Sequence, residues 1–359
     1  MDAIQERIGA ADFKILGVFD ALAEHGFPAF SATLTPAGLN LLMKLEMAEY
    51  VEESQVVQLS QNCNVQTDND WGTRRTNIRG SYTAGSYYYT TGKSGSGVDA
   101  YIVDTGIYCQ NNDFATKATT ITCTCGKDFI VAGGSCTDGN GHGTHVAGTV
   151  AGKQWGVAKE ANLIAVRVLD DSGSGSTAGV INGINWVASN AKATGKPSVA
   201  NMSLGGGFNQ GTNDATNAAV SSGVSFVVAA GNNNLNACNY SPASAASAVT
   251  VGATDISDTR ASYSNYGSCL DIFGPGTNIK SAWIGSVNAT NVISGTSMAS
   301  PQVCGVAAKY LSANTALKPA DITAKLIADA TKNIVKNANG PTASPSNVSP
   351  NLMVYGYCV

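Results

Sequence analysis

Short runs of apolar residues recur along the chain after residue 97, and they lack the polar alternation of a half-exposed strand. The runs are Val98–Val103, Leu163–Leu169, Ser225–Ala230 and Val249–Ala253. Continuous apolar runs of this length are typical of strands that are covered on both faces of a sheet. Between the second and third runs, apolar residues recur at helical spacing from Val180 to Ala188. This alternation predicts an α/β domain with a mostly parallel central sheet flanked by helices.

The first 60 residues follow a different pattern and are richer in Glu and Leu. Thr35 and Pro36 have the form of a helix N-cap followed by proline at the first helical position. Apolar residues then recur at helical spacing from Leu39 to Met47, and a strand is predicted over Ala48–Leu59. These elements predict a small α+β unit that precedes the main domain.

A polar stretch, Ser60–Asp70, joins this unit to the rest of the chain. Its composition is that of a linker at which a chain is processed, so we place a domain boundary between residues 1–63 and residues 64–359. A subdomain that stays attached is the alternative. The chain begins with MDAIQERIGA, and the basic and apolar regions of a signal peptide are not visible. We expect either a start that has been cut away, leaving the first unit truncated, or another route of export.

Composition narrows the functional classes. Charged residues make up 13% of the chain, the net charge is −4, and lysines and arginines form no run, so nothing favours binding to nucleic acid or to an anionic membrane. No apolar run reaches the roughly 18 residues that a membrane-spanning helix needs. The chain has nine cysteines and three histidines. Without a Cys-x-x-Cys pair, this content favours disulfides over a metal site and indicates an oxidising compartment.

Polar residues stand at the carboxyl ends of three predicted strands. Asp104 ends AYIVD, Ser203 ends VANMS, and Asn232 follows SFVVAAG. In an open parallel sheet, sites form outside the carboxyl ends of the strands. We therefore expect these three residues to lie side by side at one edge of the sheet, where they can contribute to a common site.

Two helices are predicted to begin at the same edge. One follows His142 in GHGTH, and the other follows Ser297 in SGTS, with Pro301 in its first turn, where the missing N–H costs little. A serine at a helix N-terminus lies near free backbone N–H groups and the positive end of the helix dipole. Taken alone, Ser297 would be a helix cap; beside the other polar residues it is placed to generate an oxyanion.

Six motifs occur along the chain in the order DTGI, HGTHVAGTV, SLGGG, AAGNNN, SNYGS and SGTSMASP. Together they resemble the subtilisin-like serine peptidases, most closely the proteinase K branch, from about Asn64 to the C-terminus. Residues 28–59 resemble the second half of that family's inhibitory propeptide. The resemblance implies a secreted serine endopeptidase, made as a self-processing zymogen, that has broad specificity and prefers aromatic or aliphatic residues before the scissile bond.

Matched motif by motif, the resemblance assigns the catalytic residues. Ser297 is the nucleophile and His142 its general base, while Asp104 orients the imidazole and stabilises its protonated form. Asn232 and the backbone N–H of Ser297 form the oxyanion hole. The two asparagines after Asn232 are alternatives for that donor, and the AAGN context favours the first. His145 is interpreted as a structural residue of the helix.

The resemblance also implies two sets of binding residues. Those that bind substrate are Gly173, Ser174, Gly175, Ser203, Leu204, Gly205, Ala229, Ala230 and Gly231. The first two segments hold an extended peptide between them by strand addition, and the small, uncharged third segment forms a roomy apolar pocket. Catalysis needs no cofactor. A structural calcium ion is implied by a set of oxygen ligands from Ala246, Ala248 and Asp271.

The disulfide pairing of the cysteines can be interpreted in part. Cys238 and Cys269 resemble a disulfide pair of bacterial relatives in this branch. Cys109 and Cys136 are the second predicted pair, because they bracket residues 107–136, which match the family poorly. Cys63 is the odd cysteine, lost if the chain is cut just after it. The alternative is that several thiols are free and buried, including that of Cys304.

Other functional classes fit less well. A non-catalytic peptide-binding protein on the same scaffold would require a damaged triad or oxyanion group, and none is damaged here. A lipase or esterase would require Gly-x-Ser-x-Gly, and GTSMA departs from this motif at the last glycine. The expected partners are protein and peptide substrates and the chain's own propeptide as inhibitor. We expect a monomer that binds neither nucleic acid nor membranes.

Overall fold

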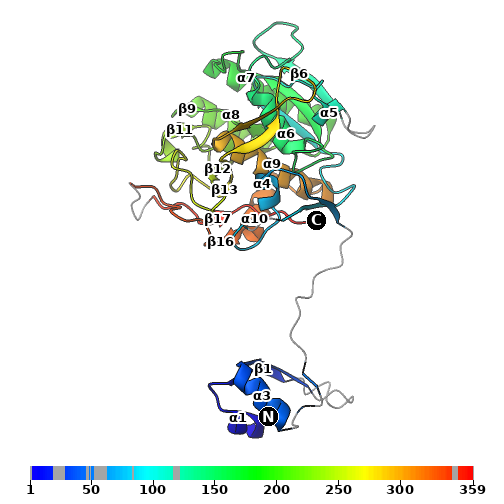
Figure 1. Cartoon of the computed structure of the whole chain (residues 1–359). Coiled ribbons are helices and arrows are strands. Elements are labelled where there is room, and N and C mark those ends of the chain that lie inside the picture. The colour runs from blue at the N-terminus through cyan, green and yellow to red at the C-terminus, as the bar shows by residue number, and fades with distance from the viewer. Residues whose placement is uncertain are drawn as a thin grey trace. The chain divides into compact units, whose positions relative to one another are not determined.

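The structure is a computed structural model that describes residues 2–18, 29–45, 48, 50–51, 63–82, 85–115, 122–341 and 347–358. The chain divides into two compact units, Met1–Ser60 and Gln61–Val359 (Figure 1). This division falls three residues before the predicted boundary at Cys63. Most of the strand predicted over Ala48–Leu59 lies outside the described residues.

The N-terminal unit is a small α+β arrangement. Strands β1 and β2 pair antiparallel, and Phe13 and Leu42 are buried in its core. Thr35 caps α3 as predicted, since its hydroxyl accepts a hydrogen bond from the N–H of Gly38 at 3.1 Å and proline follows it. The elements are α1 (Asp2–Ile8), β1 (Phe13–Val18), β2 (Phe30–Leu34) and α3 (Pro36–Lys44).

The larger unit is built on a nine-stranded sheet in the order β16-β17-β13-β12-β10-β8-β5-β7-β6. Neighbouring strands pair in parallel, except β16 and β17, which are antiparallel. The sheet confirms the predicted fold class, and each predicted run corresponds to a strand. The strands are β5 (Asp99–Asp104), β6 (Cys123–Asp128), β7 (Asn162–Arg167), β8 (Ser198–Met202), β10 (Ser225–Ala229), β12 (Val249–Thr254), β13 (Ile272–Pro275), β16 (Thr331–Lys332) and β17 (Leu352–Met353).

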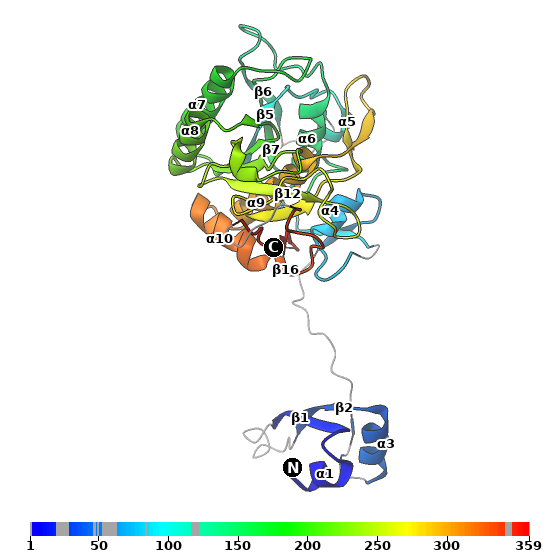
Figure 2. The ribbon, with the colours of Figure 1, turned by 90° about the vertical axis from the view of Figure 1, so that its left-hand side faces the viewer.

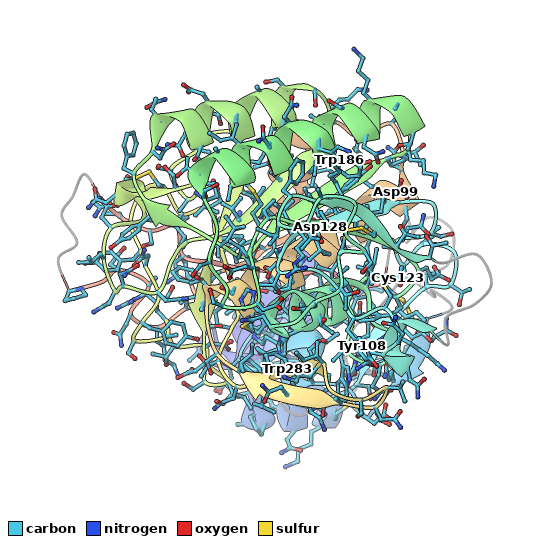
Figure 3. All side chains as sticks on the ribbon, turned by 90° about the horizontal axis from the view of Figure 1, so that it is seen from above. Asp99, Tyr108, Cys123, Asp128, Trp186 and Trp283 are labelled. Carbon is cyan, nitrogen blue, oxygen red and sulfur yellow. A yellow bond between two sulfur atoms is a disulfide. The ribbon has the colours of Figure 1, made fainter. Side chains whose placement is uncertain are left out.

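Helices cover both faces of this sheet (Figure 2). Because side chains alternate along a strand, Ala100 and Ile102 of β5 pack with α6 and α9, whereas Tyr101 and Val103 pack with α7 and α8. Trp186 of α7 contacts the ring of Tyr101 edge-on (Figure 3). Among the described residues, no helix is long and apolar enough to cross a bilayer. The helices are α6 (His142–Ala151), α7 (Thr177–Thr194), α8 (Gln210–Ser221), α9 (Thr296–Ala313) and α10 (Pro319–Asp329).

Smaller elements complete the larger unit. Three two-stranded sheets are formed by β3 with β4, β9 with β11, and β14 with β15, all antiparallel. The β9–β11 pair brings the glycine-rich segment after β8 next to Tyr240. These elements are β3 (Asn64–Gln66), α4 (Trp71–Arg75), β4 (Tyr87–Tyr89), α5 (Asn112–Ala115), β9 (Gly206–Gly207), η1 (Ala237–Asn239), β11 (Tyr240–Ser241), β14 (Ile279–Ala282) and β15 (Thr290–Ile293).

The disulfides agree only in part with the sequence analysis. Cys238 and Cys269 are bonded, as the resemblance implied. The predicted Cys109–Cys136 pair is wrong, because the bonds are Cys109–Cys123 and Cys125–Cys136. Side chains two residues apart on a strand lie on the same face. The two cysteines of β6 therefore each form a disulfide with one of the flanking cysteines. Cys123 is labelled in Figure 3.

The assignment of the odd cysteine is also wrong. Cys63 is bonded to Cys358, so the residue expected at the processing point is linked to the end of the chain. The free cysteine is Cys304, which is fully buried in α9. Burial raises the pKa of its thiol far above the ordinary range, because the thiolate would have to be desolvated.

Candidate active site

Three neighbouring strands end at the site, as the sequence predicted. β10, β8 and β5 are adjacent in the sheet. Asn232 follows β10, Ser203 follows β8, and Asp104 ends β5. Two helices begin at this edge. His142 is the first residue of α6, and Ser297 is the second residue of α9. The parallel order of the strands therefore gathers five residues that lie up to 193 positions apart in the sequence.

Asp104 and His142 form a hydrogen-bonded pair. Nδ1 of His142 lies 2.8 Å from Oδ1 of Asp104, and because a carboxylate only accepts, Nδ1 carries the proton. Asp104 is fully buried and also accepts from the N–H of Thr105 at 2.8 Å, whereas the His142 side chain is 25% exposed. Nε2 is then free to accept a proton.

The charge state of His142 is set by opposing effects. Burial lowers the pKa of the imidazole, but the charge and hydrogen bond of Asp104, together with the charge of Asp138, outweigh it. The net result is a pKa above the ordinary value for histidine. A raised pKa makes the imidazole a stronger base, so His142 is suited to accept a proton from a hydroxyl group and to hold it.

Ser297 and Ser203 are joined by reciprocal hydrogen bonds. The hydroxyl of Ser203 donates to the carbonyl of Ser297 at 2.7 Å, and the hydroxyl of Ser297 donates to the carbonyl of Ser203 at 3.2 Å. The prediction that Pro301 lies in the first turn is wrong, because Pro301 is inside α9. Proline has no N–H to donate to the residue four positions earlier. The carbonyl of Ser297 therefore accepts from Ser203 instead.

Asn232 is held by the residue before Ser297. Its Oδ1 accepts from the N–H of Thr296 at 2.8 Å and from the hydroxyl of Thr296 at 2.9 Å. The amide is thereby oriented with Nδ2 directed away from Thr296. A Cβ placed on Gly295 would lie 3.4 Å from this Nδ2. The helix offers no acceptor to the N–H of Ser297, so two donors are present beside the Ser297 side chain.

A groove of about 580 Å³ adjoins His142 and Ser203. Its walls include both segments that the resemblance assigned to peptide binding, together with His142. The lining residues are Thr105, Asn140, His142, Leu169, Ser172, Gly173, Ser174, Gly175, Ser176, Thr177, Val180, Ser203, Leu204, Gly205, Gly206, Gly207, Asn209, Thr212, Ser241 and Pro242. Ala229, Ala230 and Gly231 do not line it. Gly231 instead donates its N–H to Thr296 at 3.1 Å.

The first wall of the groove is an exposed, glycine-containing turn. Asp170 shapes it, because its carboxylate accepts from the N–H of Ser174 at 3.0 Å while its own N–H donates to the carbonyl of Ser174 at 2.8 Å. Gly173 has a φ of +80°, which other residues rarely adopt. Exposed backbone on this wall leaves N–H and C=O groups available to an extended peptide.

The predicted calcium ligands provide a plausible oxygen set. Ala246 and Ala248 can offer only backbone carbonyls, and Asp271 is a carboxylate whose pKa burial raises to about 6. Its Oδ2 accepts from the N–H of Thr250 at 2.8 Å, and the ion pairs of the described residues do not include it. A desolvated carboxylate without a cationic partner among the described residues is the type of oxygen ligand that Ca²⁺ prefers. The part of the chain that the structure describes has no cluster of three or more His, Cys, Asp or Glu that could hold a metal.

His145 lies away from the reacting groups. It is fully buried, its Nε2 donates to the carbonyl of Ile279 at 2.9 Å, and its ring contacts that of Trp283. Burial lowers the pKa of its imidazole to about 4. These contacts are those of an uncharged packing residue, in keeping with the interpretation made from the sequence.

Sequence reasoning missed the polar residues that support Ser297. Asn201 donates from Nδ2 to the hydroxyl of Ser203 at 2.8 Å, and its Oδ1 accepts from Ser300 at 2.8 Å. Thr296 fixes Asn232, as described above. One signal was available for Asn201, since a fully buried asparagine within an otherwise apolar strand requires partners.

The sequence model of the subtilase family matches residues 95–348. Alkaline serine exoprotease A of Vibrio alginolyticus is 43% identical over 94% of this chain and 61% of its own length. The extracellular serine proteinase of Thermus sp. (strain Rt41A) is 48% identical over 85% of this chain and 70% of its own length. The chain thus spans about two thirds of the length of these relatives.

A solved structure also matches. It is described as the crystal structure of a cold adapted subtilisin-like serine proteinase. The TM-score is 0.73 at 46% sequence identity, and the match covers 80% of this chain and 98% of the other. The similarity therefore extends over nearly the whole of that structure, including the strands and helices that hold the site described above.

Proposed function

The chain belongs to the subtilase family, and on this premise we propose that it is a secreted serine endopeptidase with Asp104, His142 and Ser297 as its catalytic residues. The observation that carries the proposal is the 2.8 Å hydrogen bond between Asp104 and His142 at the edge of the groove. Ser297 lies in the first turn of α9, and the two donors of the proposed oxyanion hole lie next to its side chain.

The geometry supports a defined division of labour. Nδ1–H of His142 is fixed on Asp104, which leaves Nε2 to take the proton of the Ser297 hydroxyl as the oxygen attacks the scissile carbonyl. Rotation about the Cα–Cβ bond of Ser297 releases its hydroxyl from the carbonyl of Ser203 for this transfer. The negative charge that develops on the substrate oxygen is stabilised by Nδ2 of Asn232 and the N–H of Ser297.

The substrate is an extended segment of a protein or peptide. It adds as a strand between Gly173–Gly175 and Ser203–Gly205, which together with Ala229–Gly231 are the proposed substrate-binding residues. Among the described residues that line the groove, none is acidic. We therefore expect broad specificity, with aromatic or aliphatic side chains rather than basic ones before the scissile bond. Calcium, held by the set that includes Asp271, has a structural role alone.

The chain acts as a zymogen in this proposal. The N-terminal unit is compact and separately folded, as an inhibitory propeptide must be. Four disulfides in the larger unit support an extracellular location, as does the similarity to the extracellular serine proteinase of Thermus. The mature enzyme is expected to be a monomer that separates from the N-terminal unit by its own cleavage.

Labelling with a fluorophosphonate probe tests the proposal. The processed protein is expected to react with the probe and to hydrolyse casein, and Ser297→Ala is expected to do neither, because the variant lacks the nucleophile. Ser294→Ala is the matched control, since Ser294 is exposed and its hydroxyl is hydrogen-bonded to Asn278. Equal labelling of wild type and Ser297→Ala, or a processed wild type without proteolytic activity, would overturn the assignment.

A further inference from the structure

Asp138 is a buried carboxylate to which the proposed reaction assigns no part. It lies in the loop before α6, four residues ahead of His142, and it is 3% exposed. The ion pairs of the described residues do not include it. A buried carboxylate without a cationic partner has to be compensated by hydrogen bonds, so the donors that surround Asp138 indicate what it holds in place.

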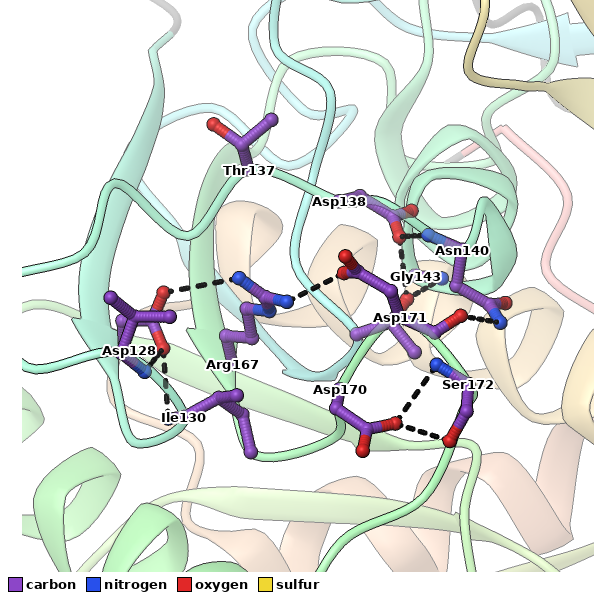
Figure 4. A network of polar contacts seen from close by, with 12 residues as sticks. Asp128, Ile130, Thr137, Asp138, Asn140, Gly143, Arg167, Asp170, Asp171 and Ser172 are labelled. Carbon is purple, nitrogen blue, oxygen red and sulfur yellow. Dashed lines mark hydrogen bonds and ion pairs between the residues drawn. The ribbon is translucent and has the colours of Figure 1, made fainter.

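Both oxygens of Asp138 accept hydrogen bonds, and Figure 4 shows the one from the N–H of Asn140. Oδ1 accepts from the hydroxyl of Thr105 at 2.8 Å and from the N–H groups of Asn140 and Gly141 at 2.9 and 2.8 Å. Oδ2 accepts from the N–H and the hydroxyl of Thr144 at 2.9 and 2.6 Å. An amide side chain cannot accept on both of its terminal atoms. The loop therefore requires the two acceptor oxygens of an aspartate side chain.

These donors belong to both sides of the Asp104–His142 pair. Thr105 directly follows Asp104 at the end of β5, and Thr144 lies two residues after His142 in the first turn of α6. Asp138 thus ties the strand that carries one member of the pair to the helix that carries the other. Without Asp138, the distance between the side chains of Asp104 and His142 would be less well fixed.

We propose that Asp138 is a positioning residue for His142, which holds the imidazole against Asp104 and adds a second negative charge that favours its protonated form. This inference rests on the proposed function, in which His142 accepts a proton from Ser297. Asp138 itself touches neither the imidazole nor the substrate in this assignment. It acts through the loop and through its charge.

The proposed effect of the Asp138 charge agrees with the titratable groups around His142. Asp104 faces it from β5, Asp138 faces it from the loop, and His145 lies one turn further along α6. Burial keeps the pKa of His145 near 4, so this second imidazole is uncharged at neutral pH. The two carboxylates together hold the pKa of His142 above its ordinary value.

An arginine and two aspartates form a cluster beyond the loop. Arg167 donates to Asp128 at 3.4 Å and to Asp171 at 2.6 Å (Figure 4). The backbone carbonyl of Asp171 accepts from Nδ2 of Asn140 at 3.0 Å. One arginine does not balance two aspartates, so the cluster carries a net negative charge, but the charges that raise the pKa of His142 are those of Asp104 and Asp138. Asp138 is therefore the second carboxylate whose removal is expected to change the titration of His142.

The test is the pH dependence of kcat/KM for Asp138→Asn. Removing the charge lowers the pKa of His142, so the unprotonated base persists to lower pH. We expect the acidic limb of the profile to move down by about half a pH unit. We also expect kcat to fall about tenfold or more, because the imidazole is less well fixed, with a smaller change in KM. A merely structural role would lower activity without moving the limb.

Asp99→Asn is the matched control. Asp99 is also a buried aspartate and begins β5, the strand that Asp104 ends, but it bonds to Asn162 and Lys196. It is expected to leave the profile unchanged. The same titration of His142, followed by NMR in the Ser297→Ala background, does not depend on activity. An unmoved pKa for His142 in Asp138→Asn would refute the inference even if the protease assignment holds.

A second variant decides the matter if Asp138→Asn fails to fold. Thr144→Val removes one hydroxyl donor to Asp138 and leaves the charge in place. We expect a fall in kcat of about tenfold, with the acidic limb at its wild-type position. Unchanged kcat in this variant would show that the contacts of Asp138 do not position His142.

Discussion

Asn232 offers a sharp test of the site because its two terminal atoms have separate tasks. Oδ1 accepts two hydrogen bonds from Thr296, while Nδ2 is the proposed donor to the substrate oxyanion. Asn232→Leu removes both functions at similar volume. Asn232→Asp keeps an oxygen for Thr296 and removes only the N–H donor, so the two variants separate support of the loop from support of the transition state.

The expected magnitudes follow from these contacts. Losing an oxyanion donor lowers kcat by about 100- to 1,000-fold, which corresponds to about 2.7–4 kcal/mol. KM is expected to change little, because the oxyanion forms only in the transition state. Leucine also leaves the N–H and hydroxyl of Thr296 without their acceptor. At roughly 0.5–1.5 kcal/mol for each bond, Asn232→Leu is expected to lower the free energy of unfolding by about 1–3 kcal/mol, whereas Asn232→Asp is not expected to lower it.

Steady-state hydrolysis of an aromatic anilide peptide measures kcat and KM, and urea unfolding of the Ser297→Ala background measures stability without self-digestion. Asn233→Leu is the matched control, since Asn233 is the adjacent exposed asparagine and its backbone N–H donates to Asn265. A kcat for Asn232→Leu within threefold of wild type would refute the assignment of the donor. If kcat falls in Asn233→Leu alone, the donor would be Asn233 and not Asn232.

Two further predictions concern the calcium set and processing. Asp271→Asn, or chelation of the wild type with EGTA, is expected to lower the melting temperature and leave kcat of the folded enzyme unchanged, with Asp255→Asn as a half-buried control. A wild type whose melting temperature EGTA leaves unchanged in calorimetry would remove the calcium proposal. The N-terminal unit is expected to separate from the wild type on a non-reducing gel, with Ser297→Ala staying full length. Because Cys63 is bonded to Cys358, release without reductant requires a cut before Cys63, and release only after reduction would contradict this expectation.

Much of the site could be predicted because it depends on a local pattern and a general rule. Apolar runs identified the strands, and the parallel order then brought their carboxyl ends together. Asp104, Ser203 and Asn232 were placed in this way before any resemblance was used. The roles of these residues came from the resemblance, because a strand end alone does not distinguish a catalytic carboxylate from a turn former.

Contacts between distant segments were harder to predict. The pairing of Cys109 with Cys123 depends on where β6 runs relative to the loop after Asp104, and a sequence segment that matches its relatives poorly gives no such register. Asp138 was missed because a lone aspartate in a glycine-rich loop is usually a turn former. Its role emerges only from the donors that folding brings to it.

Two disulfides of the larger unit close segments on which the proposed site depends. Cys125–Cys136 fixes the start of the loop that carries Asp138, and the carbonyl of Cys136 accepts from the N–H of Ile107 at 3.0 Å. Cys238–Cys269 closes the loop that contains the proposed calcium carbonyls. Each covalent link lowers the conformational freedom of the unfolded segment that it closes. The sheet thus places the reacting groups, and the disulfides limit the movement of the loops that position them.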